Sequence, residues 1–350
     1  MTTALLILLA LAVLGLAYER WARGHDRKTW SHPGQLIDVG GHRLHARTYG
    51  EHEPLVVFEA DEGAWSTHWG RIPEELGAAA ATTVTYDRGG LGWSEPGPPP
   101  RDAETLAREL HQLLARVAPG RPAVLVGHGT ASHILRAYAH RYPFETAGLV
   151  LVDPFHDGLP DRLRREQIPP AKPSAWMLRV TSFLSSAGIL RLLQKSSSSN
   201  AHLPLPDRQR TMLDALELDP RVRKGAAEEM AAEEQSLRYV SRLSDTHEIP
   251  MRILVSTETL GEDEVPDDFP REDYNRLWSD QSEAFLDLSR HARRVLVEGS
   301  GHQLQLERPE VVVEAVLDVL DEVSDLRSRP DEDAGEPAPS DPARKAEEPA

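Results

Sequence analysis

The order of hydrophobic and polar positions along the chain predicts strands that alternate with helices. Short apolar or β-branched runs, which are typical of buried strands, lie at 55–60, 82–86, 123–126, 148–153, 251–256 and 293–298. Apolar positions with helical spacing lie at 101–118, 132–141, 273–290 and 311–323, and 67–76 also favours a helix. Two further strands, 35–39 and 43–49, flank Gly40-Gly41, which is a hairpin signal. This alternation predicts an α/β fold with a mostly parallel central sheet, which binds ligands beyond the carboxyl ends of its strands.

Residues 155–247 interrupt this alternation. They contain Pro169-Pro170, a serine run at 196–199 and helical patterns at 176–193 and 209–243. We therefore expect a core made of 35–154 and 248–326, with a helical insertion between its two parts. The serine run is typical of a flexible linker.

The N-terminal residues 1–24 predict a membrane-spanning helix. Residues 4–18 are apolar and uncharged, and the positive charges follow the run, beginning at Arg20. A helix over these 15 residues spans about 22 Å, so flanking residues must complete the crossing. The absence of a basic segment before the run favours an uncleaved single-pass anchor over a cleaved signal peptide, and a buried helix is the third reading. The positive charges after the span favour a cytoplasmic domain.

Composition narrows the choice of partners. The net charge of −17 argues against a nucleic-acid partner. No cysteine is present, and no His/Asp spacing typical of a metal site stands out, so we expect neither a metal nor another cofactor. Residues 327–350 are rich in acids and proline, and they predict a disordered tail.

The stretch 124–132, V-L-V-G-H-G-T-A-S, carries the most specific pattern of the chain. A strand is followed at once by Gly127-His128-Gly129-Thr130-Ala131 and then by a helix, which is the layout of a nucleophile elbow. At the centre, where such a turn presents a nucleophilic side chain, the residue is Gly129. Thr130 is a poor replacement, because a turn centred on Thr130 would place the bulky His128 where a small residue is needed. Ser132 lies a helical turn further on and would point elsewhere.

Four motifs in order resemble the α/β-hydrolase family over about residues 35–326. They are Leu55-Val-Val-Phe-Glu-Ala60, Tyr86-Asp-Arg-Gly-Gly-Leu-Gly-Trp-Ser94, the turn at 127–131, and Gly299-Ser-Gly-His302 followed by Arg308-Pro-Glu. The resemblance implies the α/β-hydrolase fold, a lid formed by the insertion 155–247, and a site at the turn. It also implies that His302 holds the position of the general base.

Other site positions follow from the same resemblance. The acid that orients His302 is either Asp153, which ends a strand, or one of Glu258, Glu262 and Asp263 after a later strand. The backbone N–H groups of Glu62 and Thr130 are the expected oxyanion donors, and His128 is expected in the pocket. The carboxylates of Asp61 and Glu62 either oppose a developing negative charge or face solvent.

Three functions remain open at this point. The first is a membrane-anchored family member that has lost serine-hydrolase chemistry and binds a small or lipid-like ligand or a protein partner. The second is a hydrolase in which His302, oriented by an acid, activates water in the space above Gly129. The third is an esterase-like hydrolase whose nucleophile lies elsewhere. Fold alone does not decide among them.

Overall fold

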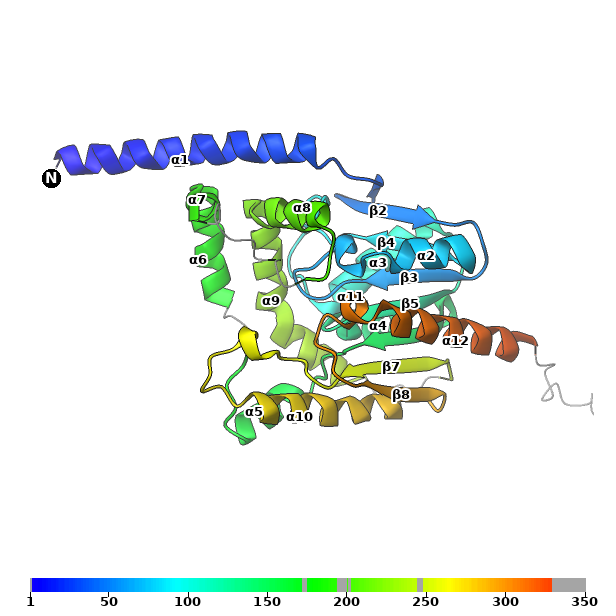
Figure 1. Cartoon of the computed structure of the whole chain (residues 1–350). Coiled ribbons are helices and arrows are strands. Elements are labelled where there is room, and N and C mark those ends of the chain that lie inside the picture. Colours follow the sequence, from blue (N-terminus) through cyan, green and yellow to red (C-terminus); the bar gives the residue numbers. More distant parts are fainter. Residues whose placement is uncertain (1, 172–174, 194–199, 201–202, 244–247, 329–350) are drawn as a thin grey trace, which may run out of the picture.

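A computed structural model describes residues 2–171, 175–193, 200, 203–243 and 248–328. The described residues form a central sheet with the strand order β1-β2-β4-β3-β5-β6-β7-β8 (Figure 1). The strands are β1 (Gln35–Asp38), β2 (Arg43–Tyr49), β3 (Leu55–Glu59), β4 (Thr82–Tyr86), β5 (Ala123–His128), β6 (Thr146–Val152), β7 (Met251–Ser256) and β8 (Ala292–Val297). The β1–β2 and β2–β4 pairs are antiparallel and all other pairs are parallel. The predicted α/β-hydrolase fold with a mostly parallel sheet is therefore confirmed.

Helices cover both faces of the sheet, and each face has its own hydrophobic core. The core helices are α2 (Ile72–Ala79), α3 (Ala103–Val117), α4 (Ala131–Arg141), α10 (Arg271–Gln281), α11 (Leu304–Glu307) and α12 (Pro309–Ser328). Along β3, Leu55 and Val57 pack in the core beneath α3 and α4, whereas Val56 and Phe58 pack in the core beneath α2 and α12. Successive residues of a strand point to opposite faces, so a strand covered on both sides is apolar throughout.

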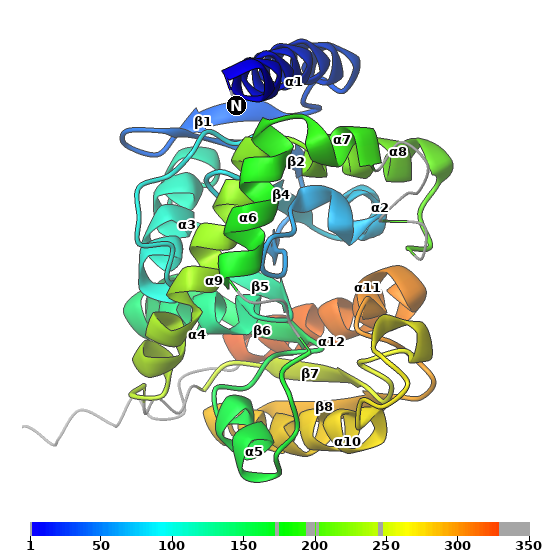
Figure 2. The ribbon, with the colours of Figure 1, turned by 90° about the vertical axis from the view of Figure 1, so that its left-hand side faces the viewer.

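Among the described residues between β6 and β7, five α-helices form the insertion. They are α5 (Leu159–Arg165), α6 (Ala175–Ser186), α7 (Ile189–Leu193), α8 (Asp207–Glu217) and α9 (Pro220–Val240). Helix α9 joins the insertion to the core, because Glu229 pairs with the buried Arg88 and the hydroxyl of Ser236 accepts the backbone N–H of Ala103 at 2.9 Å. Figure 2 shows α6 and α9 in front of the sheet.

The N-terminal helix α1 (Thr2–Thr29) is longer than the apolar run that predicted it. It is long and apolar enough to cross a membrane, and its apolar part is almost wholly exposed. Its second half contacts the insertion, where Arg191 pairs with Glu19 and Asp26, and Arg27 pairs with Asp219. The amino-terminal half projects beyond the rest of the protein (Figure 1).

Four predicted helices are each two elements in the structure, and one of them is 176–193, which forms α6 and α7. Residues 67–76 form the 3₁₀ helix η1 (Ser66–Trp69) and then α2, and 273–290 form α10 and the 3₁₀ helix η5 (Ser282–Leu288). The pattern at 209–243 belongs to α8 and α9, because Asp219 accepts the N–H of Arg221 as a cap and Pro220 begins a new helix. The predicted serine linker and nearly all of the predicted tail lie outside the described residues.

Candidate functional site

The turn between β5 and α4 has the geometry that its sequence predicts. Gly129 has φ = 58°, in the left-handed region, where a residue without Cβ carries no strain. Its carbonyl oxygen accepts the backbone N–H groups of Ser132 and Phe155 at 3.3 and 3.1 Å. The chain turns sharply here, and position 129 presents no side chain to the site.

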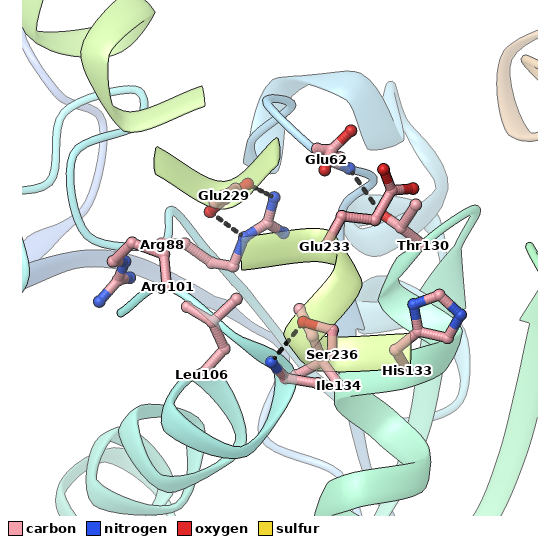
Figure 3. A pocket seen from close by; sticks show the side chains of 11 residues that line it. Glu62, Arg88, Arg101, Leu106, Thr130, His133, Ile134, Glu229, Glu233 and Ser236 are labelled. Atoms are coloured by element: carbon pink, nitrogen blue, oxygen red, sulfur yellow. Dashed lines mark hydrogen bonds and ion pairs between the residues drawn. The ribbon is translucent and has the colours of Figure 1, made fainter. Parts of the chain in front are cut away.

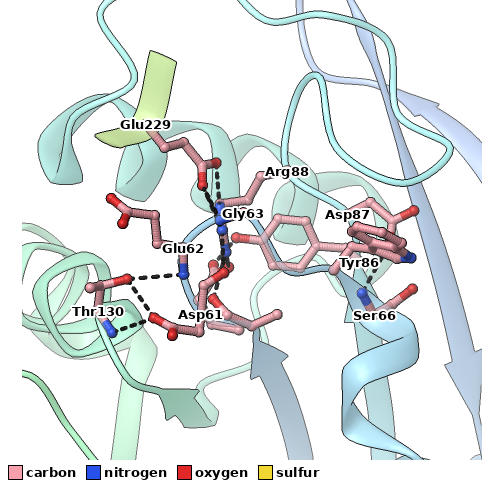
Figure 4. Close-up of polar contacts among 12 residues, drawn as sticks. Asp61, Glu62, Gly63, Ser66, Tyr86, Asp87, Arg88, Thr130 and Glu229 are labelled. Atoms are coloured by element: carbon pink, nitrogen blue, oxygen red, sulfur yellow. Dashed lines mark hydrogen bonds and ion pairs between the residues drawn. The ribbon is translucent and has the colours of Figure 1, made fainter. Parts of the chain in front are cut away.

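The carboxylate of Asp61 occupies the space above Gly129. A Cβ added to Gly129 would lie 2.4 Å from the Asp61 Cγ. Oδ1 of Asp61 accepts both the backbone N–H and the hydroxyl of Thr130, each at 2.7 Å (Figure 4). Asp61 follows β3, so the carboxylate above the turn comes from a loop that follows another strand.

This arrangement corrects the expected oxyanion site. The backbone N–H of Thr130 points inward as expected, but it donates to Asp61 and is already satisfied. The backbone N–H of Glu62 donates to the Thr130 hydroxyl at 3.0 Å and so stabilises the same loop. Of the two alternatives for Asp61, facing solvent or facing the site, the structure has the second.

His302 lies between two carboxylates. Its Nδ1 is 2.7 Å from Oδ2 of Asp153, and its Nε2 is 3.1 Å from Oδ2 of Asp61. Both ring nitrogens are therefore engaged, and the acid on Nδ1 is Asp153 rather than one of the carboxylates after β7. The structure thus brings together Gly129, Thr130, His302, Asp153 and Asp61, all of which the sequence singles out.

Asp153 is rigidly held at the end of β6. Its Oδ1 accepts the backbone N–H and hydroxyl of Ser256 at 3.0 and 2.8 Å, and the indole N–H of Trp278 at 3.0 Å. Asp153 is fully buried and has φ = 43°, which is strained for a residue with a side chain. Such strain persists only where surrounding contacts determine the conformation. Here the contacts of Oδ1 with Ser256 and Trp278 orient Oδ2 toward His302.

The two carboxylates determine the charge of His302. Burial alone lowers the pKa of His302, but hydrogen bonds to Asp153 and Asp61 outweigh burial and raise the pKa to about 10. At neutral pH the ring is therefore an imidazolium that donates from both nitrogens. His128 behaves in the opposite way, because burial lowers its pKa to about 4 and leaves it neutral. Its Nε2 donates to the carbonyl oxygen of His302 at 2.8 Å.

One cavity next to Asp61 is large enough for a small ligand. Its volume is about 300 Å³, and it is lined by Asp61, Glu62, Gly63, Ala64, His68, His128, Glu217, Ala226, Met230 and Gln303. A second cavity, between Arg88, Thr130 and His133, has a volume of about 30 Å³ (Figure 3). The second holds little more than a water molecule. The first is the larger of the two, and helices α8 and α9 help to enclose it.

Arg88 supports the loop that carries Asp61. Its guanidinium pairs with Glu59 and Glu229, and it donates to the carbonyl oxygens of Ala60 and Asp61 at 2.6 and 2.7 Å. Arg88 is almost completely buried. Sequence reasoning did not assign it this role, although a charged residue within an apolar strand, Glu59, indicates that a buried cation must be near.

Asp61, His128 and His302 also offer ligand atoms within 4.8 Å of one another, as a metal site would require. However, Nε2 of His302 already faces Asp61, and Nε2 of His128 already donates to a backbone carbonyl. A metal ion that used these nitrogens would have to displace both hydrogen bonds.

The fold of this chain is the α/β-hydrolase fold. It has the eight-stranded sheet, the sharp turn after β5 and the Asp153–His302 pair. Residues 60–315 match the model of the alpha/beta hydrolase family, and the chain belongs to that family.

Solved structures of this fold are similar over most of the chain. The epoxide hydrolase CorEH has a TM-score of 0.59 at 16% identity, over 83% of this chain and 98% of its own. A mutant of a putative epoxide hydrolase from Pseudomonas aeruginosa has a TM-score of 0.61 at 15% identity, over 83% of this chain and 96% of its own. An esterase from Thermogutta terrifontis has a TM-score of 0.55 at 19% identity, over 82% and 97%. At these identities the likeness concerns the fold.

Two curated relatives match shorter segments. A probable transporter, efuK, from Hormonema carpetanum is 30% identical over 144 residues, which are 39% of this chain and 20% of the relative. The uncharacterized protein YqjL from Bacillus subtilis is 29% identical over 133 residues, or 37% and 50% of the two chains. The matches span only a fifth and a half of these relatives, so they carry no assignment of activity.

Proposed function

We propose that this chain is a membrane-anchored α/β-hydrolase-family protein that lacks serine-hydrolase activity and binds a small ligand beside Asp61. The observation that carries the proposal is the position of the Asp61 carboxylate, directly above Gly129 and on the N–H of Thr130. A serine hydrolase needs a hydroxyl at the turn and free N–H donors for the oxyanion. In this chain an aspartate fills both places.

Activation of water by His302 is disfavoured on electrostatic grounds. A general base must offer a lone pair within reach of the proton it abstracts. The raised pKa of His302 keeps a proton on Nε2, and that proton points at Asp61. The second of the three functions from the sequence therefore requires a charge state that His302 does not hold at neutral pH.

The lining of the cavity favours a neutral or cationic ligand. Asp61, Glu62 and Glu217 bring carboxylates to its wall, and Ala226 and Met230 of α9 add an apolar side. An anion entering this site meets like charges in a region of reduced dielectric, which is unfavourable. An amphipathic ligand with a neutral or positive polar group satisfies both kinds of surface.

Membrane anchoring by α1 is part of the same proposal. The uncharged part of the helix, residues 2–18, spans about 25 Å, so flanking residues must complete the crossing of a hydrocarbon core of about 30 Å. The basic residues after its apolar part favour a cytoplasmic domain. Extraction of the full-length chain, verified by mass, from membranes by alkaline carbonate would contradict the proposed anchor. A chain shortened at its N-terminus would identify a signal peptide instead.

Ligand binding is tested by thermal shift measurements with matched neutral, cationic and anionic amphiphiles. We expect neutral or cationic compounds to raise the melting temperature and anionic ones to have no effect. Ala226→Trp fills the cavity and should abolish the shift, whereas Phe144→Trp, at a residue that is 93% exposed, should not. A shift that survives Ala226→Trp places the ligand elsewhere and contradicts the proposal.

A second candidate function is hydrolysis with Asp61 as the nucleophile. It is favoured by one observation: Oδ1 of Asp61 lies on an N–H donor while Oδ2 faces His302, which Asp153 orients. An oxygen of Asp61 would attack a carbon of a strained cyclic ether, and the C–O bond would break as His302 gives its Nε2 proton to the leaving oxygen. The neutral ester at Asp61 removes one of the charges that raise the pKa of His302. His302 then takes one proton from water, and the hydroxide attacks the ester carbonyl. The acyl C–O bond breaks, the diol leaves with the second proton, and Asp61 and His302 return as carboxylate and imidazolium.

Intact-mass measurement distinguishes the two candidates. After incubation with an aryl epoxide in water enriched in heavy oxygen, a nucleophilic Asp61 acquires the label, and Asp61→Asn prevents both labelling and turnover. No label and no turnover support the binding function and exclude the nucleophile for this class of substrate.

A further inference from the structure

Helices α6 and α7 expose a row of large apolar side chains to solvent. This apolar face consists of Trp176, Met177, Val180 and Phe183 of α6 and Ile189, Leu192 and Leu193 of α7. Trp176 and Phe183 are 67% and 73% exposed. The spacing of 176, 180 and 183 places these residues on one side of α6. A contiguous exposed apolar patch of this kind marks an interaction surface.

The opposite side of α6 is fixed on the rest of the insertion. The buried hydroxyl of Ser185 donates to the carbonyl oxygen of Leu218 at 2.5 Å, and that of Ser182 donates to Pro220 at 3.3 Å. Both acceptors lie at the start of α9 or just before it. Rotation of α6 to bury its apolar face would break these contacts, so the face needs a partner outside the described residues.

The α6–α7 junction lies where the uncharged part of α1 ends. A Cβ at Gly15 would be 2.2 Å from the carbonyl oxygen of Ala187, so the two backbones approach closely at this point. One turn further along α1, Glu19 pairs with Arg191 of α7. The apolar face of α6 and α7 is therefore continuous with the exposed apolar surface of α1.

The figures show how this face is oriented relative to α1. The amino-terminal half of α1 projects to the left in Figure 1, and α6 runs across that direction at the left side of the protein. Figure 2 is viewed from that side, and there α1 points toward the viewer with α6 at the front. A bilayer crossed by the amino-terminal half of α1 would therefore have α6 lying along its surface.

We propose that the apolar face of α6 and α7 docks into the interfacial layer of the bilayer that α1 crosses. The inference rests on the proposed membrane anchoring by α1. An amphipathic helix in this position buries its apolar side about 5–10 Å into the boundary between head groups and acyl chains. Trp176 of α6 and Trp21 of α1 are both 67% exposed, and tryptophan is enriched at this depth.

Docking of this face places the insertion between the bilayer and the cavity beside Asp61. Helix α6 packs on α9, and α9 supplies Ala226 and Met230 to the wall of that cavity. The substrate or ligand class implied is an amphiphile that is neutral or cationic.

The test uses the full chain in phospholipid vesicles. The chain has no cysteine, so single labels are introduced with Phe183→Cys, Leu193→Cys, Leu9→Cys and Phe144→Cys, each carrying a polarity-sensitive fluorophore. We expect blue-shifted emission and quenching by lipid-borne spin labels at 183 and 193. Phe144 is the matched control, since it is 93% exposed and lies far from the α6–α7 junction in sequence, and its label should report water.

The label at Leu9 separates failure of this inference from failure of the anchor. If the label at 9 is quenched by lipid and the label at 183 resembles that at 144, α1 spans the bilayer and the docking inference is wrong. A water-like signal at both 9 and 183 overturns both. A label at 183 that is shielded from water but not reached by lipid-borne quenchers indicates a contact with another protein chain and also contradicts docking to lipid.

Discussion

His45 and His302 are two buried or partly buried histidines that bond an aspartate through Nδ1. His45 lies 2.9 Å from Oδ2 of Asp87, and His302 lies 2.7 Å from Oδ2 of Asp153. Both aspartates are fully buried and also accept backbone N–H groups. To this extent the two sites are chemically alike.

They differ at Nε2. For His45 this nitrogen accepts the backbone N–H of Gly34 at 3.1 Å, which requires a lone pair and a neutral ring. For His302 it faces the carboxylate of Asp61, which favours a proton on Nε2 and a charged ring. His302 holds the position of a general base. The second carboxylate makes it a charged ring that is ion-paired through both nitrogens.

Removal of a buried carboxylate should have the largest effect, and it should be greater at His302. Asp153→Asn leaves an imidazolium with one charged partner, and loss of one member of a buried ion pair typically lowers the free energy of unfolding by about 3–5 kcal/mol. Asp87→Asn removes a partner from a neutral ring and should cost about 1–3 kcal/mol. Urea unfolding of both variants measures this. An equal or larger loss for Asp87→Asn would contradict the assigned charge states.

The pH dependence of the free energy of unfolding should report the charge of His302. The pKa of His302 is about 10 in the folded chain, against about 6.5 for an unperturbed histidine. Its contribution is therefore complete below about pH 6.5 and is lost as the pH rises toward about 10. We expect wild type to lose stability over this window by up to about 1.4 kcal/mol per pH unit relative to His302→Gln. A slope of the same size in His302→Gln would contradict the assigned charge of His302.

The smallest effect is expected for hydroxyl groups that support each site. Thr130→Val removes the hydroxyl that bonds Asp61, and Ser94→Ala removes the one that accepts the backbone N–H of His45. Each should lower the free energy of unfolding by about 1 kcal/mol. Only Thr130→Val should also lower the pKa of His302 in an NMR titration, because it loosens Asp61. No change in that pKa would show that Asp61 is held by its other contacts alone.

Much of the core could be predicted from local sequence. Apolar runs such as 55–60 must be buried on both sides, and a glycine at the centre of the turn at 127–131 permits the left-handed conformation that Gly129 adopts. The family resemblance narrowed the acid that orients His302 to Asp153 or one of the carboxylates after a later strand. The choice between the alternatives depended on the conformation at Asp153, whose φ of 43° no local pattern indicates.

The role of Asp61 could not be predicted in the same way. Whether a carboxylate after a strand faces solvent or the site depends on the path of its loop, and here Arg88 holds the Asp61 carbonyl oxygen. Arg88 is in turn fixed by Glu229, a residue of the insertion far away in the sequence. The association of α1 with α6 and α7 depends on tertiary contacts of the same kind.

The claim that Asp61 takes the place of a side chain at 129 is tested most directly with a fluorophosphonate probe, which labels an activated serine. Wild type and Gly129→Ser should both remain unlabelled, the latter because Asp61 still occupies the N–H of Thr130 and crowds the new side chain. The double variant Asp61→Gly, Gly129→Ser should be labelled, and a further His302→Ala should abolish that labelling. Labelling of Gly129→Ser as strong as that of the double variant would contradict the account.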